Sequence, residues 1–89
     1  MTYRVLYSES AIKALKKTDK HQAKMLLAWV EKHLVGCENP RLHGKPLGYN
    51  YSGAWRYRIG VYRLIADIQD DTVTIEIINI GHRKHVYTL

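Results

Sequence analysis

The stretch "AWRYRIGVYRLIADI", residues 54 to 68, restricts the fold of this chain more than any other part of the sequence. Apolar and polar side chains alternate on both sides of Gly60 and Val61, which is typical of two antiparallel strands. Gly60 at the first central position of a two-residue turn is typical of a type II′ hairpin. The turn fixes the register, and the predicted pairs are Ile59 with Tyr62, Arg58 with Arg63, Tyr57 with Leu64, and Trp55 with Ala66.

This register separates the apolar and basic side chains of the hairpin onto opposite faces. The apolar face carries Trp55, Tyr57, Ile59, Tyr62, Leu64, Ala66 and Ile68. The other face carries Arg56, Arg58, Arg63 and Ile65. Like charges directly across a ladder destabilise a sheet by up to about 1 kcal/mol, so we expect an anionic ligand near Arg58 and Arg63. The plain alternative is that solvent, Asp67 or Glu76 neutralises the arginines.

The segments before the hairpin predict one strand and two helices. Residues 2 to 7 alternate as a strand. Ser8 offers an N-cap for a helix that runs through about Lys17, and Thr18 or Asp19 caps a second helix that ends at Gly36. Because almost no linker joins the helices, we expect a helix hairpin whose apolar stripes are covered by the sheet.

A long loop and a last strand complete the predicted order. Residues 36 to 53 hold four of the six glycines and both prolines, with an edge strand at 42 to 47 as an alternative to loop. After a turn at Asp70 and Asp71, a strand runs to Gly81. It is expected to place Val73, Ile75 and Ile77 on the apolar face, and Glu76, Ile78 and Ile80 on the arginine face.

Composition favours an anionic partner. The chain has 14 Lys and Arg against 8 Asp and Glu, a formal charge of +6 on 89 residues, which fit one domain over residues 1 to 89. A solvated surface that keeps the protein soluble is the plain alternative. The single Cys37 excludes an internal disulfide, and no apolar run approaches the roughly 18 residues of a membrane span. We therefore expect a cytoplasmic protein without membrane attachment.

A second basic group follows the last strand. His82, Arg83, Lys84 and His85 are consecutive, and Tyr87 comes next but one. The arginines suit phosphate binding, and equally the stabilisation of a phosphorane during RNA cleavage. A histidine is the side chain best suited to proton transfer near neutral pH. With no cysteine or close acid, the two histidines make a poor zinc site, and we predict no metal and no cofactor.

The order of "YRVLYSESAIKALKK", a second amphipathic helix, "GKPL", "GAWRYRIGVYRLIADI" and "IGHRKHVY" resembles the RelE/ParE superfamily of bacterial toxins, and its RelE branch in particular. The resemblance implies an α+β fold of β-α-α-β-β-β order, a twisted, mainly antiparallel sheet with the two helices on one face. It also implies a cytoplasmic toxin of a type II toxin-antitoxin system, held inactive by a cognate antitoxin. RelE-like toxins cut mRNA in the ribosomal A site, next to 16S rRNA, by metal-independent attack of the 2′-hydroxyl.

The resemblance also assigns roles to single residues. Arg63 and Arg83 match arginines that stabilise the phosphorane, and Tyr87 matches a tyrosine that orients the nucleotide. Arg56 and Arg58 stand where the best-studied branch has lysines, one of them proposed as the general base. Since an arginine is a poor base, the expected alternatives are His82, His85 or Tyr87 as the base, or a cut that relies on positioning and charge alone. The expected RNA-binding residues are Lys45, Arg41, His43 and Lys84.

Two other functions remain open at this point. One is a ParE-like protein that inhibits DNA gyrase without nuclease activity. The other is an RNA-binding module whose basic face docks on RNA with no chemistry. The terminal "GHRKHVY" favours the nuclease, because a nuclease needs these side chains and a gyrase inhibitor does not.

Overall fold

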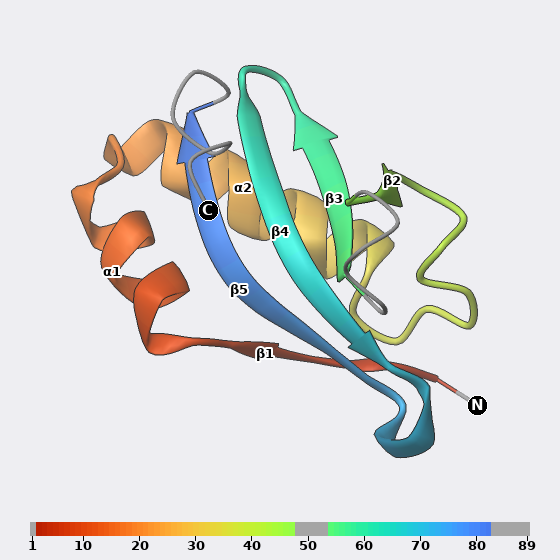
Figure 1. The fold of residues 1–89 in the computed structure, drawn as a ribbon. Helices are drawn as coiled ribbons and strands as arrows, with labels where there is room; N and C mark the ends of the chain where they lie inside the picture. Colours follow the sequence, from red (N-terminus) through yellow and green to blue (C-terminus); the bar gives the residue numbers. More distant parts are fainter. Residues whose placement is uncertain (1, 48–53, 83–89) are drawn as a thin grey trace.

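The computed structural model describes residues 2 to 47 and 54 to 82, and it has two layers, a twisted sheet and a pair of helices on one face (Figure 1). The first half contains β1 (Arg4–Tyr7), α1 (Glu9–Lys17), α2 (Lys20–His33) and the short β2 (Lys45–Pro46). The second half contains β3 (Ala54–Ile59), β4 (Tyr62–Gln69), a 3₁₀ turn (Asp70–Thr72) and β5 (Thr74–His82).

The five strands lie in the order β1-β5-β4-β3-β2. β1 runs parallel to β5, and the other neighbours are antiparallel. The predicted α+β fold is therefore confirmed, with β2 added at the place where an edge strand was the alternative to loop. No helix in the described part of the chain is long and apolar enough to cross a membrane.

Polar caps place the two helices as predicted. The Ser8 side-chain oxygen accepts a hydrogen bond from the Ala11 N–H at 3.1 Å, and Asp19 accepts from the N–H groups of His21 and Gln22 at 3.1 and 3.3 Å. Such caps satisfy N–H groups that have no partner inside the helix. Of the two expected caps for the second helix, Asp19 is the one used, and α2 ends with Leu34 as its C-cap.

The hairpin register is confirmed at every predicted pair, including Arg58 opposite Arg63. Gly60 has a φ of 60°, which the turn requires and glycine adopts without strain. On the helix side of the hairpin Tyr57 and Leu64 are fully buried, and Trp55 and Tyr62 are partly buried against the core. The Trp55 and Tyr57 rings of β3 therefore pack toward the helices, as predicted.

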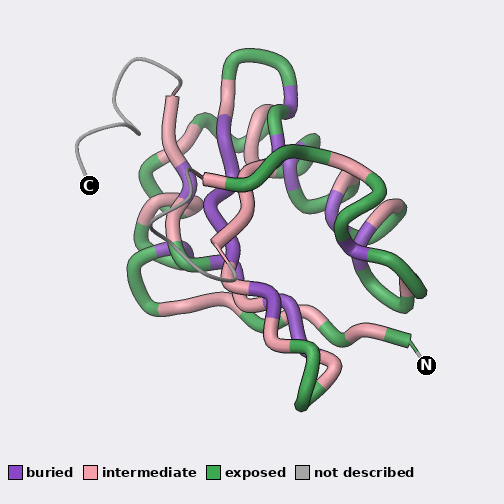
Figure 2. The backbone as a smooth tube through the Cα atoms, turned by 45° about the vertical axis from the view of Figure 1, so that its right-hand side comes forward, coloured by how far each residue is buried: buried purple, intermediate pink, exposed green. Residues whose placement is uncertain are grey.

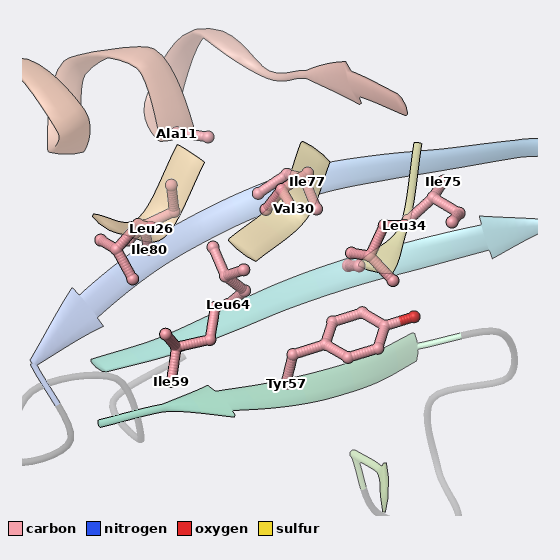
Figure 3. Packing of buried hydrophobic residues seen from close by; sticks show 11 residues of the cluster. Ala11, Leu26, Val30, Leu34, Tyr57, Ile59, Leu64, Ile75, Ile77 and Ile80 are labelled. Carbon is pink, nitrogen blue, oxygen red and sulfur yellow. The ribbon is translucent and has the colours of Figure 1, made fainter. Parts of the chain in front are cut away.

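The core fills the space between α2 and the central strands. Leu26 and Val30 of α2, with its C-cap Leu34, point toward β3, β4 and β5, where Tyr57 and Leu64 meet them (Figure 3). Buried segments follow the central strands, whereas the turns that join them are exposed (Figure 2). This packing fixes β3 and β4, and with them the side chains on the helix-free face.

The last strand differs from the predicted alternation. Ile65 pairs with Asn79 but Ala66 pairs with Ile77, so Ile78 is an extra residue in a β-bulge. Beyond the bulge the faces are exchanged: Ile80 is 5% exposed and lies in the core. Its predicted place on the arginine face was wrong.

The beginning of the strand also differs. Val73 has a φ of 50° at the end of the 3₁₀ turn, and β5 begins one residue later, at Thr74. Val73 is thus a turn residue, not the first apolar residue of the strand. Ile75 and Ile77 are fully buried in the core, as predicted.

Candidate functional site

One end of the helix-free face gathers basic side chains from three neighbouring strands. Arg58 pairs with Arg63 across β3 and β4, and Lys45 of β2 pairs with Arg56 of β3. Directly paired residues share a face of a sheet. The short β2 therefore brings Lys45 to the three arginines of the hairpin.

Arg63 is the buried member of this group. Its side chain is 6% exposed, whereas Lys45 and Arg58 are exposed and Arg56 is half-buried. A guanidinium does not lose its proton at working pH, so Arg63 is a fixed positive charge inside the protein. Placing a charge there costs solvation free energy, and an anionic ligand beside it would offset that cost.

A pocket of about 310 Å³ opens beside these cations. The described residues that line it include four cations and no acid. The described lining residues are Trp29, His43, Gly44, Lys45, Arg56, Tyr57, Arg58 and Arg63. Because β2 pairs only with Trp55 and Arg56, the pocket lies where the edge of β3 continues past β2. It joins a cationic wall to an aromatic wall.

The aromatic wall is built from α2, the loop before β2, and β3. The rings of Trp29 and His33, one helical turn apart, have centroids 4.7 Å apart. The His43 ring lies 4.9 Å from His33 and 5.9 Å from Trp29. Tyr57 of β3 lies 5.6 Å from Trp29.

Hydrogen bonds from β3 hold the loop in place. The Trp55 indole N–H donates to the His43 carbonyl at 2.6 Å, and the Tyr57 hydroxyl donates to the Pro40 carbonyl at 2.6 Å. Burial raises the pKa of Tyr57 far above its usual value, so this hydroxyl stays neutral and acts as a hydrogen-bond donor. Its role is to fix the wall of the pocket.

Arg41 lies in a different cluster. Its guanidinium donates two hydrogen bonds to Asp70, at 3.1 and 3.0 Å, and the Tyr3 hydroxyl donates to the same carboxylate at 2.7 Å. The hydrogen bonds from Arg41 and then Tyr3 lower the pKa of Asp70. Arg41, expected to bind RNA, thus ties the loop to the β4-β5 turn and does not line the pocket.

His82 is also outside the pocket. The bulge in β5 places it opposite Tyr62, with ring centroids 5.9 Å apart, and Gly81 opposite Arg63. His82 therefore shares the face of Tyr62 and not that of the arginines. The other predicted residues after Gly81, namely Arg83, Lys84, His85 and Tyr87, lie outside the described residues.

The structure thus brings together five of the predicted residues: Arg56, Arg58, Arg63, His43 and Lys45. Sequence reasoning did not find the contribution of Trp29 and His33. Their four-residue spacing on one helix was a signal for a shared face, but not for contact with a loop ten residues further on. Within residues 2 to 47 and 54 to 82, no three His, Cys, Asp or Glu side chains form a group that could hold a metal ion.

Comparison with known sequences gives two matches over nearly the whole chain. A sequence model of the family described as "ParE toxin of type II toxin-antitoxin system, parDE" matches residues 5 to 87. Toxin RelG of Mycobacterium tuberculosis is 32% identical over 89 residues, covering 98% of this chain and 98% of that protein.

Solved structures with the same fold come from bacteria and archaea. The RelBE2 toxin-antitoxin complex of Mycobacterium tuberculosis matches with a TM-score of 0.82 at 28% identity, covering 93% of each chain. The archaeal RelE-RelB complex of Pyrococcus horikoshii matches with a TM-score of 0.71 at 26% identity, covering 97% of this chain and 100% of that one. A mutant of the E. coli toxin RelE in the free state, with arginines replaced by alanine, matches in fold, with a TM-score of 0.77 at 22% identity over 97% of this chain and 88% of that one.

Proposed function

The chain belongs to the family of ParE toxins of type II toxin-antitoxin systems, in the RelE/ParE superfamily, and we propose that it is a RelE-like endoribonuclease that cuts mRNA in the ribosomal A site. The observation that carries this proposal is the pocket whose described lining holds four cations and no acid. Planar guanidinium groups bind phosphate oxygens in pairs and keep their charge. An RNA phosphodiester is the ligand that best fits this chemistry.

The proposed reaction is an internal transesterification. The substrate 2′-oxygen bonds to phosphorus, the bond from phosphorus to the 5′-oxygen breaks, and the products carry a 2′,3′-cyclic phosphate and a 5′-hydroxyl. The proton of the 2′-hydroxyl passes to a base, and the leaving 5′-oxygen gains one. Arg58 and Arg63 stabilise the extra negative charge that the phosphorane develops between these steps.

The identity of the base is separate from the role of the arginines. Arg56 and Arg58 stay protonated and serve as charges. His82, His85 and Tyr87 are the proposed proton-transfer residues, with Arg83 as a further charge on the phosphorane. Because His82 lies on the Tyr62 face, away from the arginines, we favour His85 and Tyr87 for proton transfer.

We also propose an antitoxin as the partner of this chain. The RelBE2 and archaeal RelE-RelB structures are toxin-antitoxin complexes. A chain with a formal charge of +6 is attracted to an acidic segment. Such a segment laid over Arg58 and Lys45 neutralises the site that we assign to RNA.

The experiment is primer extension on a defined mRNA, with protein added to translating ribosomes and, in parallel, to the free message. The proposal predicts new 5′ ends within codons in the A site, and only when ribosomes are present. An intact message in the presence of folded protein would contradict it.

Gyrase inhibition is the second candidate, because the matching family model carries the ParE name. A supercoiling assay with purified gyrase separates the two functions. The nuclease proposal predicts unchanged supercoiling at protein concentrations that cut mRNA. Inhibited supercoiling together with an intact message would assign the chain to the gyrase inhibitors.

A further inference from the structure

The proposed cleavage uses only one wall of the pocket. The phosphodiester chemistry needs the cations, but it gives no task to Trp29 and His43, which line the same cavity. Both side chains are half-buried and line the pocket, so each keeps exposed surface that a ligand can contact. This aromatic wall is the largest feature of the site that the reaction does not explain.

Four rings support one another in this wall. Trp29 is their centre, with His33, His43 and Tyr57 at centroid distances of 4.7, 5.9 and 5.6 Å. Contacts of this kind stabilise the packing of a helix against a loop. Packing alone, however, does not account for rings that line a pocket together with Lys45 and Arg58.

The size and chemistry of the pocket match one nucleotide. Its volume of about 310 Å³ lies at the lower end of the range for small-molecule sites. Every nucleobase has a π face that stacks on aromatic side chains, and its phosphate is recognised by Lys and Arg. Both kinds of side chain line the same cavity.

We propose that Trp29 and His43 form a nucleobase subsite, in which a base of the RNA lies against these rings while its phosphate lies against Lys45 and Arg58. The inference rests on the proposed function in one respect, because it takes the nucleotide to be part of the RNA that is cut. A subsite of this kind gives the toxin a preference among bases next to the cut. The preference arises within the protein and adds to any imposed by the ribosome.

The test is isothermal titration calorimetry of the full chain at low salt, with the four nucleoside 5′-monophosphates, ribose 5-phosphate and inorganic phosphate as ligands. Low salt is used because dissolved ions screen the attraction between the phosphate and the cations of the pocket. Base stacking predicts that the best nucleotide binds roughly tenfold more tightly than ribose 5-phosphate. Equal binding of ribose 5-phosphate and of every nucleotide would overturn the proposal.

Substitutions at Trp29 and His43 locate the effect. Trp29→Leu is expected to abolish the difference between nucleotide and ribose 5-phosphate while leaving the ribose 5-phosphate affinity unchanged, and Trp29→Phe is expected to retain it. His43→Ala, in a loop outside the core, is expected to weaken nucleotide binding only. Tyr62→Leu is the matched control, because Tyr62 is a half-buried ring outside the pocket.

The outcomes separate this inference from the proposed function. A base-dependent affinity that survives Trp29→Leu in a protein with wild-type circular dichroism would contradict the subsite. Nucleotide binding that depends on Trp29, found in a protein that leaves mRNA intact on ribosomes, would contradict the proposed cleavage and leave the subsite standing. Cleavage of mRNA on ribosomes without any base-dependent binding would contradict the subsite and leave the proposed cleavage standing.

Discussion

Asp70 shows at the scale of one residue how this small chain holds the loop between α2 and β2. Its carboxylate accepts two hydrogen bonds from Arg41 and one from Tyr3, residues distant from it in the sequence. The Trp55 ring lies 6.0 Å from the Arg41 guanidinium, which extends the cluster toward β3. These contacts hold Arg41, which lies two residues before His43 in the loop that leads into β2.

The lowered pKa of Asp70 makes the stability of the protein depend on pH. Because the folded pKa lies below the unfolded value of about 3.8, the stabilisation is fully present above that value and is lost as pH falls through the folded pKa. We expect Asp70→Asn to lower the free energy of unfolding at pH 7, and we expect this deficit to shrink as pH falls below about 3.8. Urea unfolding at pH 7 and in acid measures the deficit, and a deficit that does not shrink in acid would contradict the prediction.

The neighbouring acid provides the control for Asp70. Asp71 is exposed in the same turn. Asp71→Asn removes the same charge from the same region without touching the bonds to Arg41 and Tyr3. It is expected to leave stability unchanged at both pH values.

Gly44 fixes the position of the loop by its close approach to β3. It has a φ of 78°, and a Cβ there would collide with the Arg56 carbonyl and lie 2.8 Å from the Trp55 indole nitrogen. Gly36 has a similar φ of 75° with open space around it. We expect Gly36→Ala to cost about 1 kcal/mol from the left-handed backbone alone, and Gly44→Ala to cost clearly more. Equal losses in urea unfolding would show that the loop adapts to a side chain.

At the scale of secondary structure, the hairpin could be predicted and the last strand only in part. A two-residue turn sets every later pair in β3 and β4, so one local motif determined the face of each arginine. Nothing in "IEIINIGH" marks the extra residue at Ile78, because apolar side chains occur on both sides of the bulge. The face of Ile80 and His82 depends on that single insertion.

The bulge gives Ile78 and Ile80 different degrees of burial, so their truncation is expected to cost different amounts of stability. Ile78 is 38% exposed and Ile80 is 5% exposed. Removing buried methyl groups costs about 2–5 kcal/mol, so Ile80→Ala is expected to lose that amount, whereas Ile78→Ala is expected to lose less than about 1 kcal/mol. Similar losses from the two variants in urea unfolding would contradict the bulge.

At the scale of the whole molecule, the helix-free face is strongly basic at one end, whereas at the other end the cation Arg4 is accompanied by the acids Asp67 and Glu76. Lys45, Arg56, Arg58 and Arg63 occupy one end. Toward the other end Asp67 and Glu76 form a pair across β4 and β5, and the Gln69 amide N–H group donates to both, at 3.0 and 3.4 Å. A surface divided in this way orients an approaching polyanion with its phosphates toward the pocket.

The candidate site shows why sequence reasoning found charges more readily than shape. The arginines of one hairpin are local and follow from a turn. In the aromatic wall the Trp29 ring contacts the His43 ring, and both residues line the same pocket as Arg58. These are contacts between α2, a loop and β3 that no local pattern encodes.

The central claim is that the cations of the pocket cut RNA, and two exposed arginines on the same face test it. Arg58 lines the pocket, whereas Arg4 of β1 pairs with Thr74 at the other end of the face. Single-turnover cleavage of a defined mRNA on ribosomes should slow about 100-fold for Arg58→Ala, the usual loss of one group that stabilises transition-state charge. Arg4→Ala should cut at the wild-type rate. Equal rates for the two variants, both folded, would show that RNA is not cleaved at this pocket.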